Sequence, residues 1–143
     1  MEEIAGTTLP IIASCAGATI AELDSVVSFL NHRDKELTLM HCVAEYPTAP
    51  EIAQLNQIDF LSSRYPGLNI GFSTHEPPDN TGMVRIAIAK GCRVFEKHVA
   101  LPTDDYAANA YSATPEQVKA WLASAEEAFQ YCGVIGSRIE PTD

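Results

Sequence analysis

Two histidines and a glutamate stand where short apolar runs end, at positions that suit metal or acid–base chemistry. His75 follows the run 68–73, and His98 closes the run 92–98 with Glu96 two residues before it. Neutral imidazole is a common ligand of borderline divalent cations, and Glu96 shares a strand face with His98. From spacing alone two readings stay open, because a strand-end histidine is often a hydrogen-bonded wall residue and Glu96 fits a salt bridge equally well.

Other polar side chains occupy similar places. Ser14 and Ser73 end runs of their own and are candidate donors to an anionic substrate oxygen, while Tyr46 is either a wall of the same cavity or an aromatic packed under a loop. His41 lies inside its run and is predicted to be a hydrogen-bonded core residue. Because side chains alternate along a strand, Lys97 must point to the face opposite Glu96 and His98, and it is predicted to be structural. No serine or cysteine lies in a nucleophile-elbow motif.

The elements that must position these side chains alternate regularly. Apolar runs at 9–14, 37–42, 68–73 and 92–98 read as short buried strands. Each is followed by a helix signal: 19–30, 58–65, about 81–90, and a helix capped by Thr114 and Gln117 that ends before Gly133. This last helix carries an apolar stripe at Val118, Trp121, Leu122, Ala125 and Phe129.

The alternation predicts a parallel sheet with helical crossovers, either an open doubly wound sheet or part of a (β/α)8 barrel. A nucleotide-binding open sheet needs a glycine-rich phosphate turn, and residues 14–19 hold a single glycine. The 143 residues are too few for a complete barrel of about 250. We therefore predict one α/β domain over 1–143, a (β/α)4 half of a TIM barrel.

Charge and cysteine content exclude several classes. Nine Lys and Arg against 19 Asp and Glu give a net charge of −10, which disfavours nucleic acid and anionic membrane surfaces as partners. No apolar run approaches the roughly 20 residues of a membrane span, and the acidic start lacks the basic region of a signal peptide. Four widely spaced cysteines argue against a disulfide scaffold or zinc site. A cytoplasmic protein with reduced thiols is expected.

Three segments together resemble a known family. Residues 39–48 (LMHCVAEYPT), 70–75 (IGFSTH) and 95–98 (FEKH) are similar to the sialic acid synthases, which make N-acetylneuraminate and related nonulosonates from phosphoenolpyruvate. Residues 12–19 resemble that family's segment after barrel strand five, and 111–116 resemble the start of its last barrel helix. The likeness keeps motif order and spacing over almost the whole chain.

The resemblance implies roles for the candidate residues. His75 and His98 would bind a divalent metal, typically manganese, with magnesium or cobalt as alternatives. Ser73 would belong to the phosphoenolpyruvate pocket, Tyr46 to the substrate site, and Ser14 to the same cavity. Glu96 is the catalytic candidate because it shares the strand face of His98, where it would orient a ligand or accept from a substrate hydroxyl. The implied reaction joins C3 of phosphoenolpyruvate to the aldehyde of an N-acyl hexosamine such as N-acetylmannosamine, with the metal as Lewis acid. Water then adds at C2, and phosphate leaves by C–O cleavage.

The chain also departs from the family pattern. Ala44 stands where the family has asparagine, Ser-Thr-His-Glu at 73–76 replaces Ser-Asp-His-Thr, and 101–106 carries no basic residue. The likeness begins at strand five, so the N-terminal half-barrel, its phosphate-binding lysines and the C-terminal antifreeze-like domain have no counterpart, although 139–141 fits the linker to that domain.

The expectation is half of a synthase barrel with weak or no activity alone, because a dianionic substrate needs cationic partners. The alternatives are a homodimer that completes the barrel, a non-catalytic sugar- or metal-binding module, and an unrelated small α/β enzyme.

Overall fold

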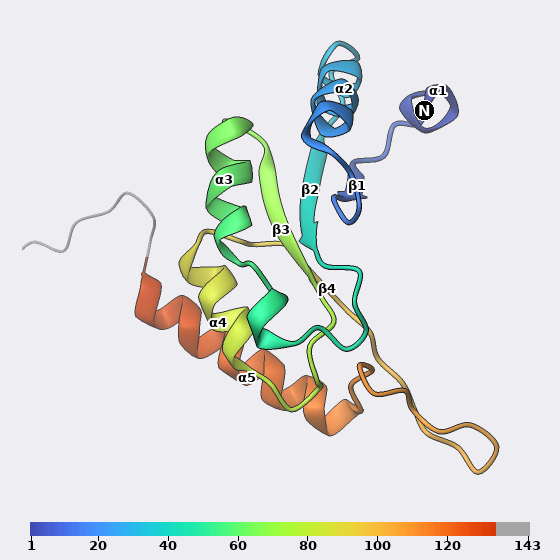
Figure 1. Ribbon diagram of the computed structural model, residues 1–143, viewed down its shortest axis with the longest axis vertical. Helices are drawn as coiled ribbons and strands as arrows, with labels where there is room; N and C mark the ends of the chain where they lie inside the picture. Colours follow the sequence, from blue (N-terminus) through green and yellow to red (C-terminus); the bar gives the residue numbers. More distant parts are fainter. Residues whose placement is uncertain (134–143) are drawn as a thin grey trace, which may run out of the picture.

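A computed structural model describes residues 1–133 of the chain, which fold as alternating strands and helices (Figure 1). The elements in order are α1 (Glu2–Ala5), β1 (Ile11–Ser14), α2 (Ile20–Asn31), β2 (Leu37–Cys42), the 3₁₀ helix η1 (Pro50–Ile52), α3 (Asn56–Arg64), β3 (Asn69–Thr74), α4 (Gly82–Ala89), β4 (Phe95–Lys97) and α5 (Pro115–Cys132). The linker predicted at 139–141 lies outside the described residues.

The four strands form one parallel sheet in the order β1-β2-β3-β4. In Figure 1, α3, α4 and α5 lie together on one side of the strands. The sheet curls into half of a (β/α)8 barrel, and the predicted fold class is confirmed. Parallel neighbours need helical crossovers, which the order strand, helix, strand supplies.

Burial along the strands shows which face each residue occupies. The central strands β2 and β3 are buried almost throughout, whereas the edge strand β1 alternates and exposes Ile12 and Ser14. Since successive side chains point to opposite faces, Ile12 and Ser14 lie on the inner, barrel-facing side. The same alternation puts Ser73 and Glu96, which are register partners, on that side.

The outer face packs against the helices and forms the main core. Strand residues from β1 to β4 meet apolar side chains of α2, α3 and α4 there, and the contributing residues include Leu23, Val27, Leu30, Leu37, Leu39, Ile58, Leu61, Ile70, Phe72 and Met83. A second cluster joins α4 to α5 around Val84, Ile88 and Trp121. The helices therefore support one face of the sheet and leave the inner face for the polar side chains.

Local sequence signals set most helix ends. The hydroxyls of Thr19 and Thr114 accept from the backbone amides of Glu22 and Gln117. The side chains of Glu22 and Gln117 in turn accept from the backbone amides of the two threonines, so both predicted capping boxes are present. The strand limits differ by a few residues: β1 begins at Ile11 rather than residue 9, and β4 covers Phe95–Lys97 rather than 92–98.

The predicted apolar stripe of α5 is wrong at two positions. Leu122 is 54% exposed and Phe129 is 36% exposed, whereas Ser124 and Ala128 are buried beside Trp121. The reason is that α5 packs on α4, where Ser124 donates to the Thr81 carbonyl at 3.2 Å. The buried face of α5 is thus made by Trp121, Ser124, Ala125 and Ala128, and Leu122 and Phe129 lie outside it.

The four cysteines are free thiols, as expected. Burial raises the pKa of Cys15 to about 11 and that of Cys92 to about 12. These two thiols therefore stay protonated at neutral pH, whereas Cys132 is exposed. Among residues 1–133 no helix is both long and apolar enough to cross a membrane.

Candidate functional site

Four aromatic rings meet at the carboxyl ends of β3 and β4. His75 lies with its ring centroid 5.0 Å from that of His98 and 4.4 Å from that of Tyr46. Tyr111 closes the group, 5.0 Å from His98 and 5.1 Å from Tyr46. The two histidines that the sequence places at successive strand ends are therefore neighbours in space.

Backbone hydrogen bonds hold both histidines from outside the sheet. The Thr48 amide donates to the His75 carbonyl at 2.9 Å, which ties the loop after β2 to the end of β3. The Ala113 amide donates to the His98 carbonyl at 2.9 Å, next to a bridge between Val99 and Ala113. Each histidine is thus fixed by a segment that returns from another part of the chain.

The His75 ring presents one nitrogen to the site. Its Nδ1 lies 3.2 Å from the Val43 carbonyl oxygen, which can only accept, and 3.9 Å from Cys42 Sγ, so the closer contact favours a proton on Nδ1. Nε2 is then left with its lone pair. Burial, with a smaller contribution from His98, lowers the pKa of His75 and favours the neutral ring.

This arrangement fits a divalent metal. A carbonyl partner on one ring nitrogen commonly orients a histidine whose other nitrogen binds a metal, and His98 is exposed on the same side. Within residues 1–133, no group of three or more His, Cys, Asp or Glu side chains is placed to hold a metal ion. His75 and His98 would supply two imidazole ligands to such a metal, and further ligands would come from water, substrate or other protein residues.

Ser73 and Glu96 lie beside the histidines on the inner face. The Ser73 hydroxyl donates to Glu96 Oε1 at 3.4 Å. Ser73 is buried, whereas Glu96 is exposed and free to turn toward the inner space. A salt bridge, the alternative role for Glu96, does not occur in the described part of the chain, because no Lys, Arg or His nitrogen lies in range of its carboxylate.

Ser14 lies on the same face but not in the cluster. It ends β1, opposite Met40 of β2, and its hydroxyl accepts from the Ala16 amide at 3.2 Å. One strand, β2, separates it from Ser73 on β3. The structure thus brings together Tyr46, Ser73, His75, Glu96 and His98, with Ser14 as a distant part of the inner surface.

Two predicted structural residues occupy the outer face. His41 is 5% exposed, with Nε2 2.8 Å from the Ala53 carbonyl and its ring stacked on Phe72. Burial lowers its pKa. Lys97 pairs with Glu76 at 3.1 Å behind the site. Both predictions, a satisfied core histidine and a structural lysine, agree with the structure.

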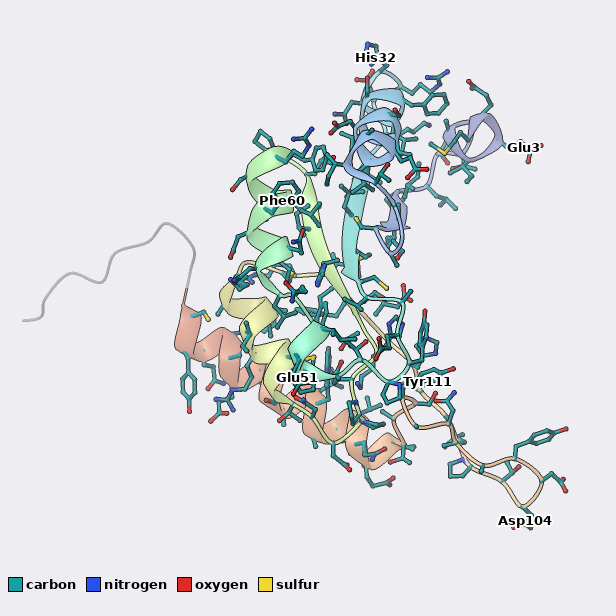
Figure 2. The ribbon with its side chains drawn as sticks, in the orientation of Figure 1. Glu3, His32, Glu51, Phe60, Asp104 and Tyr111 are labelled. Atoms are coloured by element: carbon teal, nitrogen blue, oxygen red, sulfur yellow. The ribbon has the colours of Figure 1, made fainter. Side chains whose placement is uncertain are left out.

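Tyr111 is the site residue that sequence reasoning did not assign. It lies 13 positions after His98, beyond an irregular segment, and no periodic pattern connects the two. In Figure 2 Tyr111 lies at the base of the projecting loop, whose far end carries Asp104. A further strand near Tyr111 would have indicated that the chain returns to the site. Within the described residues the structure has one isolated β-bridge there, between Val99 and Ala113, and no such strand.

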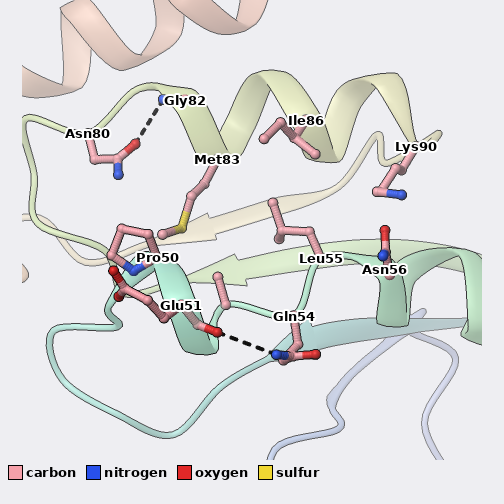
Figure 3. Close-up of a pocket in the computed structure, with 11 residues that line it drawn as sticks. Pro50, Glu51, Gln54, Leu55, Asn56, Asn80, Gly82, Met83, Ile86 and Lys90 are labelled. Atoms are coloured by element: carbon pink, nitrogen blue, oxygen red, sulfur yellow. Dashed lines mark hydrogen bonds between the residues drawn. The ribbon is translucent and has the colours of Figure 1, made fainter.

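A cavity of about 480 Å³ lies elsewhere, between η1, α3 and α4 (Figure 3). Met83, Leu55 and Ile86 form its apolar wall, and Asn80 and Lys90 lie at its two ends. It opens on the helical side of the sheet and includes none of the predicted site residues. The polar cluster at the strand ends therefore remains the candidate site.

Four parallel βα units with a histidine pair at their carboxyl ends define half of a (β/α)8-barrel protein. The NeuB family model matches residues 1–136, so the chain belongs to the NeuB family. The family resemblance seen in the sequence is confirmed.

Relatives of known sequence and structure agree. The chain is 31% identical over 124 residues to an N-acetylneuraminate-9-phosphate synthase of Drosophila melanogaster, covering 84% of this chain and 32% of that protein. A putative spore coat polysaccharide biosynthesis protein E from Chromobacterium violaceum superposes with a TM-score of 0.94 at 49% identity, covering 98% of this chain and 42% of that one. A sialic acid synthetase from Leptospira borgpetersenii, in complex with citrate, gives 0.84 at 27% identity, covering 99% and 48%. The chain spans about a third of the length of the curated relative.

Proposed function

We propose that residues 1–133 form the metal-binding half of a phosphoenolpyruvate-dependent nonulosonate synthase. The observation that carries the proposal is the facing pair His75 and His98, with Ser73 and Glu96 beside them on the inner side of the sheet. Family membership and relatives named as sialic acid synthases support it. The free thiols fit a cytoplasmic location.

In this proposal each side chain has one task. His75 Nε2 and the His98 ring would hold manganese, with magnesium or cobalt as alternatives. When bound, the metal would act as a Lewis acid on the aldehyde of an N-acyl hexosamine. Ser73 would donate to an oxygen of phosphoenolpyruvate, and Glu96, which accepts that hydroxyl in the structure, would then accept from a sugar hydroxyl.

Tyr46 and Ser14 would bind substrate at two separate places on the inner face. Tyr46 is half-exposed beside His75, where it can cover a bound sugar. Ser14 ends β1 and can meet the more distant end of a substrate. Lys97, which is buried with Glu76, is not free to neutralise a phosphate here, so we propose that the described chain alone has weak or no activity.

Phosphate release from phosphoenolpyruvate with N-acetylmannosamine and manganese tests the function. The chain alone should give little release, whereas a chimera that carries residues 11–133 in place of the matching segment of the Chromobacterium violaceum relative should release phosphate, provided that the relative itself does. Substituting His75→Ala and His98→Ala in the chimera should remove the activity. An active relative with an inactive but folded chimera would contradict the proposal.

A homodimer that completes eight strands is a second candidate, favoured by the two open sheet edges. Within the described residues β1 and β4 each pair on one side only, and Ile12 is 60% exposed on the inner face. Open edges and apolar faces promote association. Sedimentation equilibrium should show a dimer that Ile12→Glu weakens at least tenfold. Ile86→Glu is the matched control, because Ile86 is 49% exposed in the cavity wall on α4, away from the inner face. A monomer at all concentrations would exclude it.

A further inference from the structure

One ion pair of the described chain is buried at both ends. Lys97 Nζ lies 3.1 Å from Glu76 Oε1, with side-chain exposures of 7% and 0%. The other four described pairs lie nearer the surface, such as Lys90 with Asp59 at 21% and 55%. A fully desolvated pair is costly, so its presence behind the candidate site requires an explanation.

The pair directly adjoins the two histidines in the sequence. Glu76 follows His75 just after the end of β3, and Lys97 is the last residue of β4, directly before His98. The side chains meet on the helix-facing side, while the histidine rings meet at the mouth of the inner side. The bond therefore joins the ends of β3 and β4 at the level of the histidines.

Helix α5 supports the pair from outside. Lys97 Nζ lies 5.9 Å from the centre of the Trp121 ring, and Phe95 meets the same ring edge-to-face at 5.7 Å. Trp121 is itself buried. Lys97 is thus held between a carboxylate on β3 and an aromatic ring on α5, which restricts the position of β4.

Stability alone does not account for the pair. Replacing a buried ion pair by apolar residues of similar volume is often neutral or stabilising. Glu76 Oε2 also makes no hydrogen bond within residues 1–133, so the carboxylate depends on Lys97. What the pair provides that an apolar contact does not is a directional link between two particular strand ends.

We infer that the Glu76–Lys97 pair is a positioning device that sets the distance between the His75 and His98 rings. Its link to metal binding rests on the proposed function, but the ring geometry itself does not. β4 has only three strand residues, and its outer edge is open in the described chain. The Ala113 segment bonds the backbone of His98 and Ala100 beyond the strand, whereas Lys97 provides a side-chain link from β4 to the end of β3.

The test uses the metal-free chain and two readouts, the Tm and the NOE between the His75 and His98 rings. Lys97→Met alone leaves Glu76 buried and unpaired and should lower the Tm by about 10 °C. The double variant Glu76→Leu/Lys97→Met replaces both charges by apolar side chains and should recover most of that loss, yet the ring NOE should fall at least threefold. Lys97→Arg keeps the charge and should retain the NOE.

Lys90→Met is the matched control, because it breaks an ion pair with Asp59 away from the site. It should leave the NOE unchanged. A double variant that is folded and keeps the wild-type NOE overturns the inference, even if the single variant does not fold. Manganese titration then separates the proposed metal site from the positioning role of the Glu76–Lys97 pair. If the wild-type chain does not bind manganese, the proposed metal site is contradicted, and the NOE measured without metal still decides the positioning role. If wild type binds, affinity in the double variant should fall about tenfold.

Discussion

Replacing His75 and His98 together by alanine should abolish the thermal stabilisation that manganese gives to this chain. A ligand that binds only the native state raises stability by about 2.7 kcal/mol at 100 times its Kd. The two ring centroids lie 5.0 Å apart, and the contact of His75 Nδ1 with the Val43 carbonyl leaves His75 Nε2 for an ion beside the His98 ring. The two histidines that remain, His32 and His41, lie apart from the site, at the end of α2 and in β2.

The chain contains matched histidines for comparison. His32 lies on the surface of α2 with Nδ1 on the Ser28 carbonyl, and His41 is buried on the outer face. His32→Ala should keep the full manganese shift. His41→Gln should lower the starting Tm but keep the shift. Differential scanning fluorimetry across a manganese series measures all four proteins, and equal shifts in wild type and the double variant would disprove the metal site.

Gly71→Ala should destabilise the chain, by about 3 kcal/mol at the upper end of overpacking costs. A Cβ at Gly71 would lie 2.4 Å from Met40 Sδ and 2.6 Å from the Val94 carbonyl oxygen. The sulfur can move, but the carbonyl accepts from the Phe72 amide at 3.0 Å and joins β3 to the segment before β4. Relieving the contact therefore disturbs the strand pairing that carries Ser73 and Glu96.

Gly82→Ala supplies the control for this second prediction. A Cβ there would meet only Asn80 Oδ1 at 3.4 Å, at the start of α4. Its effect should stay within about 0.5 kcal/mol. Urea unfolding monitored by circular dichroism gives the free energy of unfolding of both variants. Equal losses in the two variants would show that the close contacts at Gly71 do not destabilise Gly71→Ala.

Much of the fold was predictable because the deciding interactions are local. The Thr114–Gln117 capping box closes within four residues, and the mainly apolar run 37–42 marks a strand buried on both faces. Helix α5 shows the limit of such reasoning. Its stripe included Leu122 and Phe129, and the orientation of α5 on α4 left both of them exposed.

The same division holds for the candidate site. His75, His98, Ser73 and Glu96 were identifiable because strand ends converge at one edge of a parallel sheet. Tyr111 was not, because a single bridge at Val99 and Ala113 returns its segment to the site. The Glu76–Lys97 bond was also hidden, since period-two alternation indicates a face but not the partner across strands.

The sequence by itself therefore determined the order of elements, the helix caps and the residue types at the strand ends, all of which depend on neighbours within a few positions. Only the tertiary structure decided which side chains touch: the ring cluster of two histidines and two tyrosines, and the buried pair behind it. The physical reason is that these contacts join segments 13 to 65 residues apart. Their geometry follows from how the sheet curls and where α5 packs, which no local pattern encodes.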